Sequence, residues 1–148
     1  MIKSWLIAFR LKTLTAAFVP IVVATSLVHF EGLNYSWSIS GWALLSALFI
    51  QIATNLFNDA IDFKKGADTK ERIGPKRVTQ SGLIQQKTVY QVAGLFCFLS
   101  ILCGIPLVIK GGIPIVILGL VSVLMAYLYT GGPYPLAYKG LGLSLIHI

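Results

Sequence analysis

Four long apolar stretches constrain the fold of this chain more than any other feature. They cover residues 13–28, 41–57, 89–109 and 112–129. Each is about long enough to cross a hydrocarbon layer of roughly 30 Å as a helix, the first only just so. In lipid a helix satisfies its own backbone hydrogen bonds, and no alternating strand pattern competes with it. The sequence therefore predicts an all-α, polytopic transmembrane bundle, with about four helices in this chain.

The charged residues agree with a membrane location. Only 11% of the chain is charged, whereas a soluble domain carries about 25%. Of the 12 Lys and Arg residues, all but Lys110 precede the first stretch, lie between the second and third, or follow the fourth. The positive-inside rule then predicts a multi-pass protein of the plasma (inner) membrane, with its N-terminus and the segment after the second stretch in the cytoplasm. This topology accounts for much of the net charge of +7, so nucleic-acid binding is not expected.

A stripe of polar residues begins inside the second apolar stretch and continues past its cytoplasmic end. Four members follow i, i+3, i+4, i+7 spacing with a fifth one turn upstream, so all share one helical face: Asn55, Asn58, Asp59 and Asp62, with Gln51 before them. Carboxylates near hydrocarbon are costly unless they have a partner. Asp59 and Asp62 lie one turn apart and can face one Mg²⁺, an ion that takes one or two protein carboxylates together with waters and phosphate oxygens. The stripe therefore predicts a magnesium site that holds a diphosphate.

The segment after the stripe can complete such a site. Gly66 permits a turn that would bring Asp68 back toward the other acids. Asn55 and Asn58 can add a carbonyl ligand or orient the carboxylates. Bases follow that can hold a diphosphate as it leaves: Lys70, Arg72, Lys76 and Arg77.

A simpler interpretation of this segment stays open. Its acids could pair with its many bases at the membrane surface and form a solvated loop with no metal. The metal hypothesis is favoured because Gln51 and Asn55 lie inside the apolar stretch, where a surface loop gives no reason for polar side chains.

Three motifs carry a resemblance to a known family. The motif Asn58-Asp59-x-x-Asp62 resembles the first Asp-rich motif of UbiA-type intramembrane aromatic prenyltransferases. Residues 74–82 (GPKRVTQSG) and 129–142 (YTGGPYPLAYKGLG) resemble the 1,4-dihydroxy-2-naphthoate polyprenyltransferase branch of that family, as does the long gap to Asp68. The resemblance covers nearly all of the chain up to residue 142.

The resemblance implies a substrate pair and a reaction. The substrates would be a polyprenyl diphosphate and an aromatic acid, with Mg²⁺ as cofactor and the lipid bilayer around the prenyl tail. In this reaction the magnesium-bound diphosphate would depart from the polyprenyl chain and leave an allylic cation behind. The ring of dihydroxynaphthoate would then attack this cation, and carbon dioxide would be lost to give demethylmenaquinone. The chain length of the prenyl group and the oligomeric state are left open.

The resemblance also implies roles for particular residues. The metal ligands would be Asn58, Asp59, Asp62 and Asp68. Lys70, Arg72 and Arg77, with Asn55, would hold the diphosphate. Asp59 and Asp62 would act in catalysis with Tyr138 and Lys139, beside Tyr134 in the next cytoplasmic loop. A tyrosine ring can stabilise a nearby cation by roughly 0.5–2 kcal/mol, although an interfacial aromatic belt explains these tyrosines equally well.

The chain departs from the family in one respect. The family has a second Asp-rich motif and about nine helices, but this sequence has no acidic residue after Glu71. We expect residues 1–142 to be the N-terminal part of one membrane domain. Residues 143–148 (LSLIHI) match one translation of a transposase sequencing adapter and are expected to be a non-native tail, the alternative being a natural short end. The chain alone is expected to be inactive.

Other functions remain open on the sequence. The aromatic acceptor could be 4-hydroxybenzoate, homogentisate or the naphthoate of a phytyl-transferring enzyme. A small non-enzymatic polytopic membrane protein is the alternative from another class. Magnesium-dependent binding of a polyprenyl diphosphate, lost in Asp59→Asn and Asp62→Asn, would argue against that alternative.

Overall fold

The fold of this chain is entirely helical where the structure describes it. The computed structural model describes residues 2–66 and 77–139. The helices are α1 (Ile2–Phe9), η1 (Leu11–Leu14), α2 (Thr15–Phe30), α3 (Trp37–Lys64), α4 (Gln86–Gly111), α5 (Ile113–Leu128) and η2 (Leu136–Lys139). Within these two ranges no strand occurs. The prediction of an all-α bundle is confirmed.

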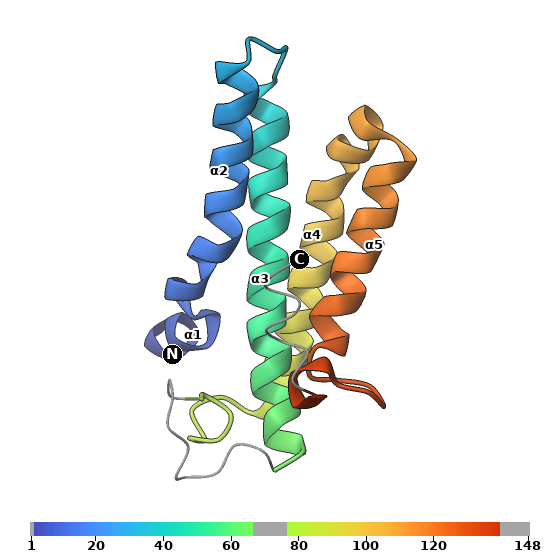
Figure 1. Ribbon diagram of the computed structural model, residues 1–148. Coiled ribbons are helices and arrows are strands. Elements are labelled where there is room, and N and C mark those ends of the chain that lie inside the picture. Colours follow the sequence, from blue (N-terminus) through green and yellow to red (C-terminus); the bar gives the residue numbers. More distant parts are fainter. Residues whose placement is uncertain (1, 67–76, 140–148) are drawn as a thin grey trace.

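The four longest helices run side by side along one direction (Figure 1). The turns that join α2 to α3 and α4 to α5 lie at one end of the bundle, which we call the hairpin end. The short helix α1, the segment 77–85 and η2 lie at the other end, which we call the α1 end. Helix α3 touches each of α1, α2, α4 and α5. It is therefore the central element on which the other parts converge.

Three helical stretches are long and apolar enough to cross a membrane, which makes this a membrane protein. They are Leu11–Phe30, Trp37–Lys64 and Gln86–Gly111. They contain the first three apolar stretches that the sequence predicts. The fourth predicted stretch forms α5, an apolar helix of 16 residues. At 1.5 Å per residue it spans only about 24 Å, because the helix begins directly after Gly112 and ends at Leu128.

The N-terminal helix α1 was not predicted. It is separated from η1 by Arg10, whose backbone is left-handed with φ of 52°. Phe9 packs edge-on against Phe96 of α4, with ring centroids 5.4 Å apart, and Trp5 lies 5.8 Å from Phe9. These aromatic contacts hold α1 against α4.

The core lies where α3 and α4 pack together. Ala53 and Ala60 of α3 are fully buried and share one cluster with Val89 and Ala93 of α4. Small side chains such as these let two helix backbones approach closely in a membrane. The Gln86 side chain adds a polar contact, because its Nε2 donates to the carbonyl of Ala60 at 2.8 Å. This packing fixes the second half of α3 in place.

Gly131 follows α5 at a point of very close approach. A Cβ atom at this position would lie 2.8 Å from the carbonyl oxygen of Tyr127 and 2.9 Å from its ring. We expect Gly131→Ala to push the segment 129–139 outward and to lower stability by about 1–3 kcal/mol. Thermal unfolding in detergent micelles measures this, with Gly94→Ala as the control, since a Cβ at Gly94 meets open space. An unchanged melting temperature for Gly131→Ala would contradict the expectation.

Candidate functional site

The polar stripe lies on the last turns of α3 and is buried there. Helix α3 continues to Lys64, so the predicted helical stripe is confirmed from Asn55 to Asp62. Its four polar members at this end, Asn55, Asn58, Asp59 and Asp62, are only 2% to 9% exposed. Buried carboxylates are strongly destabilising unless hydrogen bonds or ion pairs compensate the lost hydration. The partners of these side chains therefore define what the site can do.

The Asp59 carboxylate binds backbone only, among the described residues. Its Oδ2 accepts the N–H of Val78 at 3.0 Å, and its Oδ1 accepts the N–H of Thr79 at 3.1 Å. Both donors belong to the segment 77–85, which leads into α4. Asp59 thus ties this segment to α3.

The Asp62 carboxylate binds two side chains from different parts of the chain. Its Oδ2 forms a buried ion pair with Nη2 of Arg77 at 2.7 Å. Its Oδ1 accepts the hydroxyl of Tyr138 at 2.5 Å. The guanidinium places a positive charge against the acid, and the phenol fixes the orientation of the carboxylate. The structure therefore brings together three of the predicted site residues.

A second pair of contacts joins α3 to the segment after α5. The Thr130 hydroxyl donates to Oδ1 of Asn58 at 2.6 Å. Lys65 Nζ donates to the Thr130 carbonyl at 2.7 Å and lies 5.1 Å from the centre of the Tyr138 ring. The sequence alone predicts no role for Thr130. The only signal was its place in the motif at residues 129–142, beside Gly131.

Asn55 has partners at the start of the chain. Its Nδ2 donates to the carbonyl of Phe9 at 3.0 Å and to the hydroxyl of Thr13 at 2.8 Å. These bonds hold the break between α1 and α2 against α3. The structure brings Asn55 to this break, where its hydrogen bonds go to Phe9 and Thr13. Its role in binding diphosphate stays a prediction.

Several predicted site residues fall outside the described part of the chain. These are Asp68, Lys70, Arg72 and the side chain of Lys139. Tyr134 is described and is 69% exposed. In residues 2–66 and 77–139, no group of three or more His, Cys, Asp or Glu side chains could hold a metal ion. The oxygens of Asp62 and Asn58 do fit Mg²⁺ by donor type, because each still has a lone pair beyond the bonds described above.

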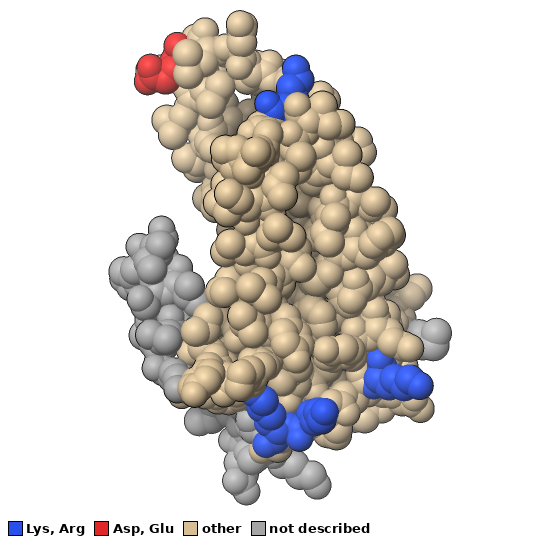
Figure 2. Space-filling model, turned by 90° about the vertical axis from the view of Figure 1, so that its right-hand side faces the viewer, with Lys and Arg blue, Asp and Glu red and all other residues tan. Residues whose placement is uncertain are grey.

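The site lies at the basic end of the molecule. Figure 2 shows most of the visible Lys and Arg atoms at the α1 end, while the acidic atoms visible on this face lie at the hairpin end. Such a one-sided charge raises the local concentration of anions such as a diphosphate.

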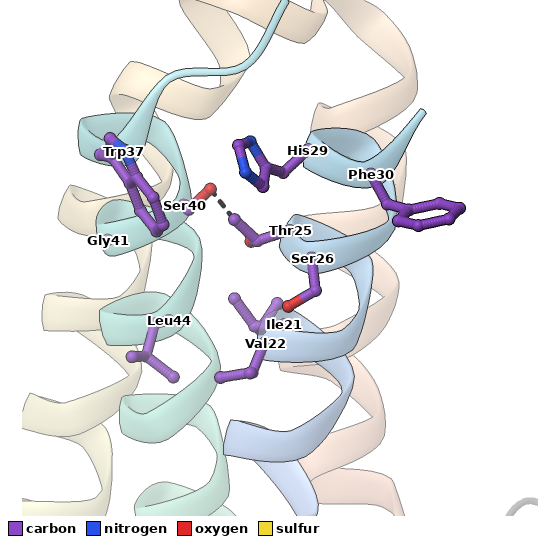
Figure 3. Close-up of a pocket in the computed structure, with 10 residues that line it drawn as sticks. All are labelled: Ile21, Val22, Thr25, Ser26, His29, Phe30, Trp37, Ser40, Gly41 and Leu44. Atoms are coloured by element: carbon purple, nitrogen blue, oxygen red, sulfur yellow. Dashed lines mark hydrogen bonds between the residues drawn. The ribbon is translucent and has the colours of Figure 1, made fainter. Parts of the chain in front are cut away.

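A cavity of about 720 Å³ lies between α2 and α3 at the opposite, hairpin end (Figure 3). Thr25 of α2 and Ser40 of α3 face one another across it and are joined by a hydrogen bond of 3.1 Å. The 28 residues of α3 span about 42 Å, so this cavity is remote from Asp59 and Asp62. It has no part in the site.

The comparison with known families decides the classification of the chain. The model of the UbiA prenyltransferase family matches residues 14–146. The chain belongs to this family. The polar contacts of the site lie within the matched range of this UbiA-family chain. The exceptions are the two bonds of Asn55, whose partners Phe9 and Thr13 precede that range.

Curated relatives show which members of the family the chain is similar to. The UbiA-family chain is 39% identical over 133 residues to a 1,4-dihydroxy-2-naphthoate octaprenyltransferase of Bacillus subtilis, covering 90% of this chain and 42% of the relative. It is 36% identical over 146 residues to the protein of the same name in Escherichia coli, covering 95% and 47%. A 2-carboxy-1,4-naphthoquinone phytyltransferase of Synechocystis is 29% identical over 144 residues, covering 95% and 45%. The chain thus spans about half the length of these relatives. No solved structure matches it.

Proposed function

We propose that this chain forms the diphosphate-binding part of an enzyme that transfers a polyprenyl group to 1,4-dihydroxy-2-naphthoate. The observation that carries the proposal is the buried ion pair between Asp62 and Arg77, at the basic end of a membrane bundle. It joins the Asp-rich motif to the basic motif at residues 74–82. The names of the relatives supply the acceptor and the prenyl donor.

Different residues of the site would bind the metal and the diphosphate. Asp62 and Asn58, with Asp68, would hold Mg²⁺, since their oxygens suit that ion. Bound magnesium would neutralise charge on the diphosphate. Arg77, with Lys70 and Arg72, would bind the diphosphate oxygens as the allylic C–O bond breaks and its electron pair leaves with the diphosphate.

The remaining steps concern the acceptor. A ring carbon of the naphthoate would form the new bond to the prenyl group, and carbon dioxide would leave, giving demethylmenaquinone in its hydroquinone form. Tyr138 lies beside Asp62 and Lys65, so its ring would be near the reacting allylic cation. Lys139 follows it in η2.

The membrane orientation belongs to the same proposal. We infer that the α1 end faces the cytoplasm of a bacterial inner membrane. The gathering of bases at this end supports that orientation, and a cytoplasmic site would meet a water-soluble aromatic acid.

The experiment uses a chimera, because the chain spans about half of its relatives. Residues 1–142 are joined to the remaining part of the Bacillus relative and expressed in membranes. We expect demethylmenaquinone from octaprenyl diphosphate and 1,4-dihydroxy-2-naphthoate, and no product from residues 1–148 alone.

Parallel reactions with 4-hydroxybenzoate, homogentisate and phytyl diphosphate test the other substrates. The junction is controlled by the unmodified Bacillus relative in the same membranes. A correctly inserted chimera that uses only another acceptor, or product formed by residues 1–148 alone, would contradict the proposal.

A further inference from the structure

The two acids of the stripe have different kinds of partner, although they lie one helical turn apart. Asp62 binds the side chains of Arg77 and Tyr138. Asp59 binds two consecutive backbone N–H groups, from Val78 and Thr79. In the described ranges, no basic side chain forms a salt bridge with Asp59.

Backbone N–H groups hold both oxygens of Asp59, whereas side chains hold both oxygens of Asp62. Each oxygen of Asp59 accepts one N–H, and the residue is 2% exposed. Backbone N–H groups bound to a carboxylate form charge-assisted hydrogen bonds, which are stronger than neutral ones. Val78, which carries one of these donors, is itself fully buried in the α3–α4 core. The carboxylate and the core together fix the backbone at residues 78 and 79.

This anchor lies directly beside the ion pair of the site. Arg77 precedes the two bound N–H groups, and its guanidinium reaches Asp62 from there. The turn that follows is closed by backbone bonds from Ser81 N to the Arg77 carbonyl and from Leu83 N to the Val78 carbonyl, both within about 3.1 Å. The position of the Arg77 side chain thus depends on where Asp59 holds the backbone next to it.

We propose that Asp59 is a positioning residue. It holds the backbone of residues 78 and 79 so that the Arg77 guanidinium stays at the diphosphate site, and it does not bind the metal. The inference rests on the proposed function, because it assigns Asp59 a role within the same site. It departs from the expectation that both acids of the stripe are metal ligands.

Hydrogen exchange of single amides tests the anchor. The chain is placed in lipid nanodiscs, and exchange of the Val78 and Thr79 amides is followed in the wild type and in two matched variants, Asp59→Asn and Asp62→Asn. We expect about tenfold faster exchange of both amides in Asp59→Asn, because local opening becomes easier when the acceptor loses its charge. Asp62→Asn keeps both bonds but removes the charge that pairs with Arg77, so it should speed the exchange of these two amides less than Asp59→Asn does. Amides within α3 and α4 report whether the fold is intact.

Binding measurements test the consequence for the site. Mn²⁺ replaces Mg²⁺ as a spectroscopic probe, and inorganic diphosphate is the anion. Asp59→Asn should weaken diphosphate binding about tenfold and leave the Mn²⁺ affinity within about threefold, whereas Asp62→Asn should weaken Mn²⁺ binding at least tenfold. A second variant, Thr79→Pro, removes one of the two donor N–H groups and leaves both carboxylates in place. It should weaken diphosphate binding and spare Mn²⁺ binding as Asp59→Asn does, and it tests the inference if Asp59→Asn folds poorly.

The outcomes separate this inference from the proposed function. Unchanged exchange at Val78 and Thr79 in Asp59→Asn would overturn the anchor. Loss of Mn²⁺ binding in Asp59→Asn as large as in Asp62→Asn would also overturn it, by making Asp59 a metal ligand. If the wild type binds neither Mn²⁺ nor diphosphate, the proposed function fails, and the exchange rates still decide the role of Asp59.

Discussion

Replacing Asp62 with asparagine is expected to lower kcat/KM for prenyl transfer by the chimera at least about 100-fold. Asp62 is the proposed metal ligand, and it binds both Arg77 and Tyr138. The substitution keeps the size of the side chain but removes the charge that pairs with Arg77 and would attract the metal. The measurement is the initial rate of demethylmenaquinone formation at several magnesium concentrations. A higher magnesium requirement in the variant would identify the lost charge as the cause.

The control for this prediction lies at the other end of the bundle. Glu31 follows α2 at the hairpin end and is exposed. Glu31→Gln removes the same charge and should leave kcat/KM within about twofold. Equal rates for Asp62→Asn and the wild type would contradict the assignment of Asp62 to the site.

The second large effect is expected on stability. Arg77→Met removes the cation from a buried pair whose side chains are 4% and 11% exposed. Removing one partner of such a pair leaves an uncompensated buried charge, which costs about 3–5 kcal/mol. We expect the unfolding midpoint in a denaturing detergent titration to fall accordingly.

A double-mutant cycle shows whether the loss comes from the pair. Arg77→Met is combined with Asp62→Leu, which removes the charge that the first change leaves unpaired. The double variant should be more stable than Arg77→Met alone, because replacing both partners by apolar groups is far less costly than removing one. If the two single effects simply add, the ion pair does not stabilise the fold.

The sequence predicts the helices well because helix formation in lipid depends on local properties. Apolar length located α2, α3, α4 and α5, and the period of 3.6 residues placed Asn55 to Asp62 on one face. Helix α1 was missed because it has only eight residues and no long apolar run. The fourth span was overestimated, since α5 ends at Leu128, before the tyrosine that the apolar stretch includes.

The partners of the site residues were harder to predict. Spacing along α3 shows that Asp59 and Asp62 are neighbours, but not that one binds backbone and the other binds side chains. That difference depends on how the chain returns at Arg77 and again at Tyr138, 15 and 76 residues after Asp62. Such returns are set by tertiary packing, which local patterns do not contain. Arg77 is one of several bases that the sequence offers after the stripe, and Tyr138 is named only through the resemblance of its motif.

These separations along the chain have a consequence for biosynthesis. Arg77 is made 15 residues after Asp62, but Tyr138 is made 76 residues after it. At a synthesis rate of about 5–20 residues per second, roughly 4–15 s pass before the phenol can reach the carboxylate. Of these two partners, only Arg77 is available to Asp62 while α4 and α5 are still being made. Of the two side-chain contacts of Asp62, the ion pair with Arg77 is therefore the first that can form as the chain leaves the ribosome.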